Sequence, residues 1–166
     1  MNDILVSIII VNYNTCPLTC ACIDSIFQNV HSCKFEVILV DNASSDNSII
    51  EIKRRYASSV KLVASDSNLG FGRANNLGVK HAFGQYLFLL NSDTVLRNDP
   101  FSYFFEFLHR RENIGALGAY LKDGNRVYTK SGGNFYSMSK YLMMGVKRFF
   151  LFLPMKKSRY RMIPAK

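Results

Sequence analysis

Two polar stretches follow apolar runs in this chain, and each contains a carboxylate. The run YLFLL at residues 86–90 is followed by the triplet at 91–93, Asn-Ser-Asp, and the run FEVILV at 35–40 is followed by Asp41. A carboxylate at such a position can hold a divalent cation or accept hydrogen bonds from a ligand. Because these residue types are also ordinary turn formers, a turn explains either stretch taken alone.

The elements that must position these carboxylates are short apolar strands. The runs at 5–11, 35–40 and 86–90 are almost continuously apolar instead of alternating, which is typical of parallel strands covered on both faces. A shorter strand is expected at 60–64. Helical patterns separate the strands, and they are expected at residues 17–29, 47–56, 72–83 and 101–111.

This alternation predicts the α/β class, with a doubly wound, mostly parallel and Rossmann-like sheet. A further strand is expected at 114–121, followed by a tight turn at Asp123 and Gly124. We expect one domain over residues 1–130. Residues 131–166 are expected to form a basic aromatic tail or the start of a further, incomplete region.

Ligands of open α/β sheets bind outside the carboxyl ends of the strands. In this sequence polar residues and glycines follow every predicted strand. They are Asn12, Tyr13 and Asn14; Asp41, Asn42, Ser44, Ser45 and Asp46; Asp66, Asn68, Gly70 and Gly72; and Asn91, Ser92 and Asp93.

This set of residues favours a nucleotide as the ligand. Tyr13 can stack on a base, Asp41 can accept from the base or ribose, and Asp93 can hold a divalent metal. Gly70 suits a tight turn and a close approach to the ligand. Arg73 either reaches a phosphate or lies on a solvated helix face.

A dinucleotide cofactor is not favoured, because Asn75 stands where the third glycine of G-x-G-x-x-G would be.

Several segments together resemble the nucleotide-sugar-binding half of family 2 glycosyltransferases. They are VSIIIVNYNT, EVILVDNASSDNS and NLGFGRANNLGVKHAFGQYLFLLNSDT, and the similarity runs from about residue 5 to about residue 120. The last segment looks most like the branch that includes bacterial rhamnosyltransferases and related cell-surface polysaccharide enzymes.

The resemblance implies a GT-A fold and an inverting transfer from a UDP-, dTDP- or GDP-linked sugar to a glycan or lipid-linked acceptor. It implies Mg²⁺ or Mn²⁺ as cofactor, with Asp93 as the metal ligand. The donor-binding positions are Val11, Tyr13, Asp41, Asn68, Gly70, Gly72, Arg73, Asn76, Asn91 and Ser92. Asn91 replaces the first carboxylate of the family's D-x-D motif.

The general base of the family, an Asp or Glu in the acceptor half, has no counterpart in this sequence. After Asp93 the chain has only Asp99, which suits a helix cap, Glu106 and Glu112, which suit a helix surface, and Asp123 in a turn. We therefore assign no base. The chain is interpreted as apparently truncated after the donor-binding half, and the alternative is a non-catalytic fragment or pseudoenzyme that binds a membrane or a partner.

The charge of the chain is concentrated at one end. The formal net charge is +9, yet residues 1–95 sum to −1 and residues 96–166 to +10. Residues 140–166 hold eight basic residues and no acidic one, and they mix these with aromatics and methionines. This tail either lies on an anionic membrane surface or serves as a linker or packing helix. Because no nucleic-acid module is recognisable, nucleic acid is not an expected partner.

The four cysteines, Cys16, Cys20, Cys22 and Cys33, lack the paired spacing of a zinc site and are expected to be structural thiols. The N-terminus reads as a first strand and shows no secretory leader. We therefore expect a cytoplasmic location, with the inner face of the plasma membrane as a further option.

Overall fold

The structure is a computed structural model that describes residues 4–110, 114–119, 121–122 and 128–129. The chain divides into two compact units, residues 1–113 and residues 114–166. The predicted domain boundary near residue 130 stays a prediction.

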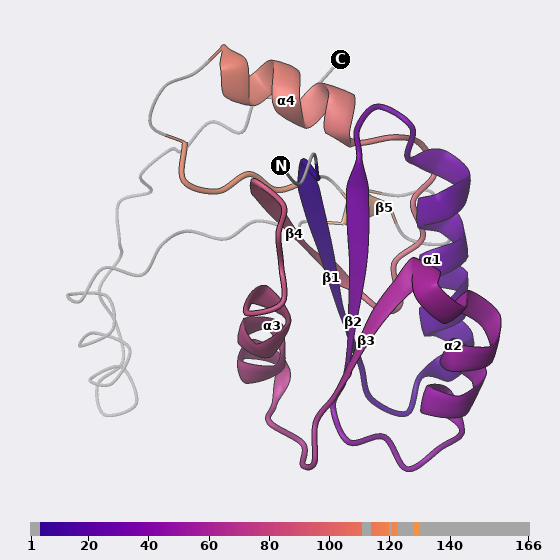
Figure 1. Cartoon of the computed structure of the whole chain (residues 1–166). Helices are drawn as coiled ribbons and strands as arrows, with labels where there is room; N and C mark the ends of the chain where they lie inside the picture. Colours follow the sequence, from indigo (N-terminus) through magenta and orange to yellow (C-terminus); the bar gives the residue numbers. More distant parts are fainter. Residues whose placement is uncertain (1–3, 111–113, 120, 123–127, 130–166) are drawn as a thin grey trace, which may run out of the picture. The chain divides into compact units, whose positions relative to one another are not determined.

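Four parallel strands form the sheet of the first unit (Figure 1). They are β1 (Val6–Asn12), β2 (Phe35–Asp41), β3 (Val60–Ala64) and β4 (Tyr86–Asn91), and they lie in the order β3-β2-β1-β4. The first strand of the chain is therefore central, with β2 on one side and β4 on the other. All four predicted strands are confirmed, and so is the parallel sheet.

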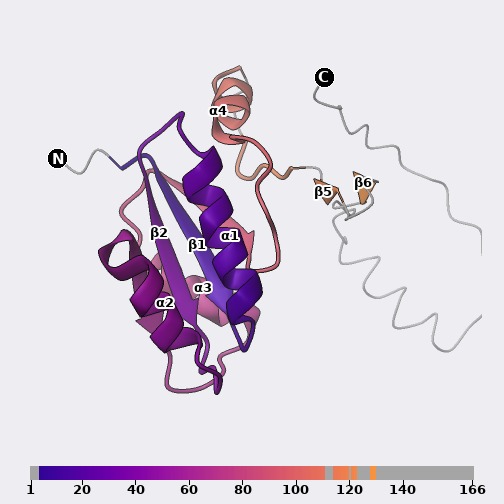
Figure 2. The same cartoon turned by 90° about the vertical axis from the view of Figure 1, so that its right-hand side faces the viewer.

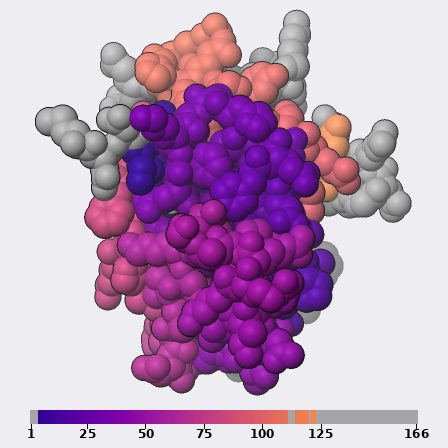
Figure 3. Space-filling model, turned by 45° about the vertical axis from the view of Figure 1, so that its right-hand side comes forward, coloured from indigo at the N-terminus to yellow at the C-terminus, as the bar shows by residue number. Residues whose placement is uncertain are grey.

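Helices cover both faces of this sheet (Figures 1 and 2). Helices α1 (Cys16–Asn29) and α2 (Ser48–Tyr56) lie on one side, and α3 (Phe71–Val79) lies on the other. A short 3₁₀ turn at Ala57–Ser59 joins α2 to β3, and α4 (Phe101–His109) follows β4. Figure 3 shows the side of α1 and α2 as one continuous surface in the indigo and purple of the N-terminal part. This arrangement confirms the doubly wound α/β fold.

The middle of β1 is buried from both sides. Ile8, Ile9 and Ile10 are all fully buried. Since successive side chains of a strand point to opposite faces, Ile8 and Ile10 join the cluster that packs under α1 and α2, while Ile9 faces α3. Burying each side chain contributes about 1.5–3 kcal/mol relative to leaving it in water.

The apolar run of β4 is buried less than the sequence predicts. Phe88 packs edge-on against Phe101 of α4, with ring centroids 5.1 Å apart. Leu87 and Leu89, however, are 50% and 54% exposed. The expectation that this strand is covered on both faces is therefore wrong. The physical reason is that α3 packs on β1 and β2, while β4 is an edge strand among the described strands.

A glycine allows α3 to lie close to the sheet. A Cβ atom on Gly78 would be 2.6 Å from Cγ2 of Ile9 and 3.1 Å from Cγ2 of Val40. Both distances are shorter than ordinary van der Waals contact, so a larger residue at position 78 would push the helix away from the central strands.

Carboxylates accept from backbone amides at the start of two helices, and the contact of Asp99 agrees with the capping role expected of it. Asp46 Oδ1 accepts from the backbone N–H of Ser48, 3.0 Å away, at the start of α2. Asp99 Oδ1 accepts from the N–H of Phe101, 2.9 Å away, at the start of α4. In both cases a carboxylate satisfies an amide of the first helical turn.

The second unit contains a two-stranded antiparallel ladder, β5 (Leu121–Lys122) with β6 (Tyr128–Thr129). The strand predicted at 114–121 is wrong over 114–119, where the backbone is not in a ladder. Residues 115–119 are exposed and include two glycines, so they offer little for a sheet to pack on. The predicted turn at 123–124 and the basic tail lie outside the described residues. In the described part of the chain, no helix is long and apolar enough to cross a membrane.

Candidate functional site

The carboxyl ends of the strands are level with one another, so the polar residues that follow them meet at one edge. In the register of the sheet, Asn12 lies opposite Asp41, and Val11 lies opposite Asn91. On the far side of β2, Asp41 lies opposite Ala64 of β3. The structure therefore brings the ends of β1, β2 and β4 together as the sequence predicted.

Asp41 is fully buried at this edge. Its Oδ1 accepts from Nδ2 of Asn12 at 2.9 Å, and its Oδ2 accepts from the backbone N–H of Ser44 at 2.9 Å. These donors compensate for the burial of a charged group. The contact with a base or ribose that the sequence predicts therefore requires the residues that cover Asp41 to move, and it stays a prediction.

Tyr13 projects from the loop that follows β1, with 48% of its surface exposed. The next residue, Asn14, adopts a left-handed φ of 54°, a conformation that asparagine tolerates better than most residues. Its side-chain oxygen accepts from the N–H of Ser45 at 2.8 Å, so the loop after β1 is tied to the loop after β2. Tyr13 thus has an accessible ring on a fixed backbone, while Val11 is half-buried beside it.

The loop before α3 is held by Asn42, for which sequence reasoning gave no role. Asn42 donates to Oδ1 of Asn68 at 2.9 Å and accepts from the N–H of Leu69 at 2.9 Å. The same oxygen of Asn68 accepts from the N–H of Gly70, which has a φ of 75°. Only glycine adopts this φ readily, so Gly70 is required by the backbone turn that starts α3.

The remaining predicted donor residues of this segment, Gly72, Arg73 and Asn76, are exposed on α3. They are therefore accessible to a ligand, and their roles stay predictions.

The triplet after β4 forms a turn and presents its carboxylate to solvent. The N–H of Thr94 donates to the carbonyl of Asn91 at 3.1 Å, which closes the turn. Asn91 and Asp93 are exposed, and Ser92 is half-buried. Within the described residues, no three side chains of the His, Cys, Asp or Glu types are grouped to hold a metal. One carboxylate suits a hard cation that takes its other ligands from water and phosphate oxygens, so Asp93 fits Mg²⁺ or Mn²⁺ shared with a diphosphate.

Two residues of helix α1 hydrogen-bond to the segment that contains this turn, and the sequence gave no sign of these contacts. The thiol of Cys22 donates to the carbonyl of Asn91 at 3.6 Å. Burial, together with the nearby charge of Asp93, raises the pKa of this thiol to about 12. Further along, Ser25 Oγ accepts from the N–H of Leu96 at 3.0 Å. The predicted structural role of Cys22 therefore consists in holding the segment that carries Asp93.

Comparison with known families identifies this architecture. Residues 7–161 match the family described as glycosyl transferase family 2, which is most of the chain. The chain belongs to glycosyl transferase family 2.

Curated glycosyltransferases are similar to the chain, with 26–32% identity over the aligned residues of two of them. Glycosyltransferase GlyG of Streptococcus pneumoniae serotype 4 is 26% identical over 134 residues, which cover 80% of this chain and 42% of GlyG. The Escherichia coli UDP-Glc:alpha-D-GlcNAc-diphosphoundecaprenol beta-1,3-glucosyltransferase WfgD is 32% identical over 95 residues, which cover 57% of this chain and 37% of WfgD. The chain thus spans less than half the length of these two relatives.

Solved structures show the same fold. S. aureus TarS residues 1–349 in complex with UDP-GlcNAc superposes with a TM-score of 0.58 at 21% identity, over 64% of this chain and 32% of TarS. The mannosyltransferase PcManGT from Pyrobaculum calidifontis, in complex with GDP-Man and Mn²⁺, has a TM-score of 0.53 at 25% identity, over 57% of this chain and 29% of PcManGT.

A general base of the family 2 kind is not found among the described carboxylates that follow Asp93. Asp99 accepts from the backbone N–H groups of His31 and Ser32 at 2.8 and 2.7 Å, as well as from α4. Glu106 forms an ion pair with Arg110 at 2.6 Å, one helical turn away. Both carboxylates are therefore committed to structural contacts. The other two candidates, Glu112 and Asp123, lie outside the described residues.

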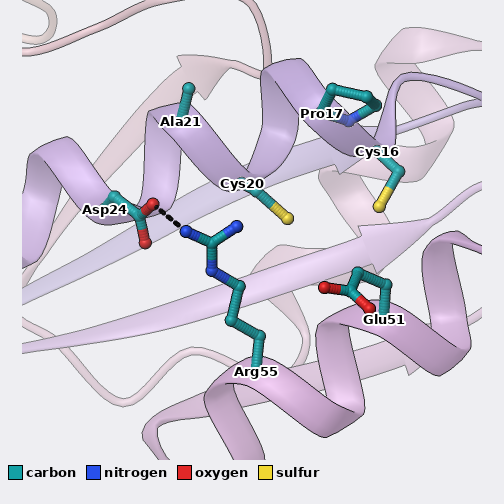
Figure 4. Close-up of a pocket in the computed structure, with 7 residues that line it drawn as sticks. All are labelled: Cys16, Pro17, Cys20, Ala21, Asp24, Glu51 and Arg55. Carbon is teal, nitrogen blue, oxygen red and sulfur yellow. Dashed lines mark hydrogen bonds and ion pairs between the residues drawn. The ribbon is translucent and has the colours of Figure 1, made fainter.

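A hollow of about 400 Å³ lies between α1 and α2, and none of its lining residues is predicted to bind the donor (Figure 4). Its cation, Arg55, points toward Asp24 and forms an ion pair with it at 2.7 Å. Glu51 at its rim pairs with Arg54 at 2.6 Å. Because these charges are already paired, the hollow offers no free charged group to a family 2 donor.

Proposed function

We propose that this chain is the donor-binding part of a metal-dependent, inverting glycosyltransferase. It transfers a sugar from a nucleoside diphosphate to a cell-surface polysaccharide or lipid-linked acceptor. The observation that carries the proposal is the register of the sheet, because β1 lies between two strands that both end in a carboxylate-bearing segment. One segment carries Asp41 and the other carries Asp93.

The nucleoside lies at the β1–β2 side of this edge. The exposed ring of Tyr13 stacks on the base, and Val11 borders it. Asp41 accepts from the base or the ribose once the residues that cover it have moved. Asn12 and Ser44 leave acceptor positions open for this contact, since an ionised carboxylate has about four of them.

The diphosphate lies at the β4 side and against the start of α3. Asp93 would hold Mg²⁺ or Mn²⁺, which when bound neutralises the charge that develops on the leaving diphosphate. Asn91 is a neutral neighbour of this carboxylate, and Ser92 lies between them. The loop from Asn68 to Asn76 borders the diphosphate and sugar, with Gly70 and Gly72 allowing close approach.

The names of similar proteins support this assignment. TarS was solved with UDP-GlcNAc, and PcManGT was solved with GDP-Man and Mn²⁺. The name of WfgD specifies a UDP-linked sugar donor and a diphosphoundecaprenol-linked acceptor. We propose further, from the resemblance of the segments around residues 68–78 and 89–93, a bacterial, rhamnosyltransferase-like enzyme of the cytoplasm that works at the inner face of the plasma membrane.

The donor-binding domain extends over residues 1–130 in this proposal, and residues 140–166 provide a peripheral contact with anionic lipids. The general base belongs to an acceptor-binding part of the enzyme beyond this domain. In this proposal the chain contributes the donor half of the enzyme.

Thermal unfolding in the presence of nucleotides tests the proposal. UDP, dTDP and GDP are compared with Mn²⁺ and with EDTA. A bound nucleotide at a hundred times its dissociation constant should add about 2.7 kcal/mol to the free energy of unfolding. The Mn²⁺-dependent part should vanish in Asp93→Ala and persist in Asp66→Ala, which removes another exposed carboxylate that follows β3, a strand separated from β4 by β2 and β1. If none of the three nucleotides shifts the unfolding temperature, the proposal is wrong.

A second function, nucleotide-sugar binding without transfer, is favoured by one observation. The described carboxylates that follow Asp93 are both engaged, in helix capping or in an ion pair. This alternative predicts normal nucleotide binding and no sugar transfer or donor hydrolysis. An in-frame acidic motif downstream of residue 166 in the gene, with activity in the longer product, would exclude it.

A further inference from the structure

A buried asparagine, Asn12, connects the two ends of the proposed donor site. It is the last residue of β1 and is fully buried. Its Nδ2 donates to Oδ1 of Asp41 at 2.9 Å and to Oγ of Ser44 at 3.0 Å. Its Oδ1 accepts from the hydroxyls of Thr15 at 3.0 Å and Thr19 at 2.7 Å. The amide therefore has two donor and two acceptor contacts, which is its full capacity.

The orientation of this amide follows from its partners. An ionised carboxylate only accepts hydrogen bonds, so the NH₂ group of Asn12 must face Asp41. The oxygen of Asn12 then faces α1, where hydroxyl groups donate to it. An aspartate or a leucine at position 12 could not satisfy both sides.

The contacts continue from α1 to the turn that carries Asp93. Oγ1 of Thr15 lies 3.4 Å from Oγ of Ser92, which is the longest link of the series. Asp41, Asn12, Thr15 and Ser92 thus form a polar chain across the end of the sheet. Thr19 contacts the same oxygen of Asn12, but the contacts described for its side chain stop at Asn12 and Thr15.

We propose that Asn12 is a positioning residue, which holds Asp41 and, through Thr15, the Ser92–Asp93 turn in one fixed arrangement. This inference rests on the proposed function, because it assigns the two ends to the nucleoside and to the metal-bound diphosphate. Paired hydrogen bonds in a buried site polarise one another and define a single geometry, whereas a partly satisfied set costs free energy. A ligand that binds both ends, once the residues that cover Asp41 have moved, then finds the two carboxylate-bearing segments already held at a fixed spacing.

Four variants separate positioning from folding. Asn12→Leu removes the whole connection at similar volume. Thr15→Val and Thr19→Val each remove one hydroxyl that donates to Asn12, but only Thr15 reaches Ser92. Thr15→Ser restores the hydroxyl at position 15. Circular dichroism and urea unfolding of each variant establish how much of the chain is folded.

The measurement is the dissociation constant of the folded chain for uridine, thymidine and guanosine, and for UDP, dTDP and GDP with Mn²⁺ or EDTA. The gain from Mn²⁺ is the ratio of the two diphosphate constants. Thr15→Val should reduce this gain by about three- to tenfold, the effect of one lost hydrogen bond, and leave nucleoside affinity unchanged. Thr15→Ser and Thr19→Val should keep the gain, and Asn12→Leu should weaken both nucleoside and metal-dependent binding.

The outcomes distinguish this inference from the proposed function. If the native chain binds nucleotides with a gain from Mn²⁺ and Thr15→Val binds in the same way, the positioning role is overturned and the proposed function stands. An equal loss of the Mn²⁺ gain in Thr15→Val and Thr19→Val would also overturn the positioning role, because a general weakening of α1 would affect both variants alike. A native chain that binds no nucleotide, or gains nothing from Mn²⁺, overturns the inference together with the function. If Asn12→Leu does not fold, the comparison at position 15 still decides.

Discussion

Strands β1 and β4 lie side by side and have similar sequences, yet they differ in how deeply their side chains are buried. Each is an apolar run that ends in asparagine and continues into a polar turn. The isoleucines of β1 are fully buried, whereas Leu87 and Leu89 of β4 are about half exposed. The polar end differs in the same way, because Asn12 is buried and fully hydrogen-bonded while Asn91 is exposed.

The two ends of the proposed donor site therefore differ in how they are prepared for a ligand. At the end of β1 the protein supplies the hydrogen-bond partners of Asn12 and Asp41 itself, so their arrangement exists before the residues that cover Asp41 move for a ligand. At the end of β4 the carboxylate of Asp93 faces solvent, and a cation with its phosphates would complete the site. The β1 side is therefore expected to set geometry, and the β4 side to respond to metal.

The largest expected effect tests the burial of the two strands. Ile10→Ala should lower the free energy of unfolding by about 2–5 kcal/mol, because it leaves a cavity under α1. Leu89→Ala, at a side chain that is 54% exposed, should cost much less. Urea unfolding measures both. Similar losses for the two variants would show that β4 is covered in solution as closely as β1.

The next effect concerns how the two strands are held at their other ends. A Cβ atom on Gly84, just before β4, would lie 2.5 Å from the backbone nitrogen of Ser7 in β1. Gly84→Ala should therefore lower the free energy of unfolding by about 3 kcal/mol, the upper end of the usual cost of overpacking, because the backbone of β1 at Val6 and Ser7 must shift. Gly72→Ala is the matched control, since nothing lies within 4 Å of its added atom. Equal stabilities of the two variants would contradict the close packing at position 84.

A smaller effect, on ligand affinity, distinguishes the β1 end of the proposed donor site from its β4 end. Tyr13→Ala should weaken nucleoside and nucleotide binding alike by about fivefold, or about 1 kcal/mol, because it removes the stacking ring and leaves Asp93 in place. The gain from Mn²⁺ should stay unchanged, as measured by titration calorimetry. Tyr103→Ala removes an exposed tyrosine ring on α4, at a residue with no role in the proposed donor site, and serves as the control. A variant at position 13 that loses only the Mn²⁺ gain would reverse the assignment of the two ends.

The smallest effect concerns acid stability of the segment after β4. Burial alone would raise the pKa of Asp99, but hydrogen bonds from the N–H groups of His31, Phe101 and Ser32 hold it below its ordinary value of 3.8. The ionised form therefore stabilises the fold at and above about pH 4, and this contribution is lost as the pH falls through the lowered pKa.

Replacing Asp99 by Asn should lower stability at neutral pH and flatten its decline below pH 4. Unfolding curves between pH 2 and pH 7 check this, and Glu106→Gln, at an exposed ion pair, should leave the decline unchanged. A decline in Asp99→Asn as steep as in the native chain would contradict the assignment.

The fold was predictable because its signals are local. Continuous apolar runs, helical periodicity and capping residues such as Asp99 act within a few positions of the chain, and all three indicated elements that the structure contains. The apolar pattern gave a wrong prediction at 114–119. This segment includes small residues and glycines, which offer a strand little side-chain surface to pack.

Less of the candidate site was predictable. The sequence placed Tyr13, Asp41 and Asp93 at one edge, because the ends of parallel strands must meet there. It gave no sign that Asn42 holds the loop before α3 or that Cys22 supports the turn after β4. These contacts join residues 26 and 69 positions apart, and such pairs carry no periodic signal.

The sequence by itself determined the class of fold, the family and the edge at which polar residues collect, since periodicity and short motifs are properties of neighbouring residues. Only the tertiary structure decided which apolar strand is buried on both faces and which carboxylate is enclosed. Burial and hydrogen bonding depend on partners that are distant along the chain. For that reason Asn12 and Asn91, which are the last residues of neighbouring strands, differ in burial and in hydrogen bonding.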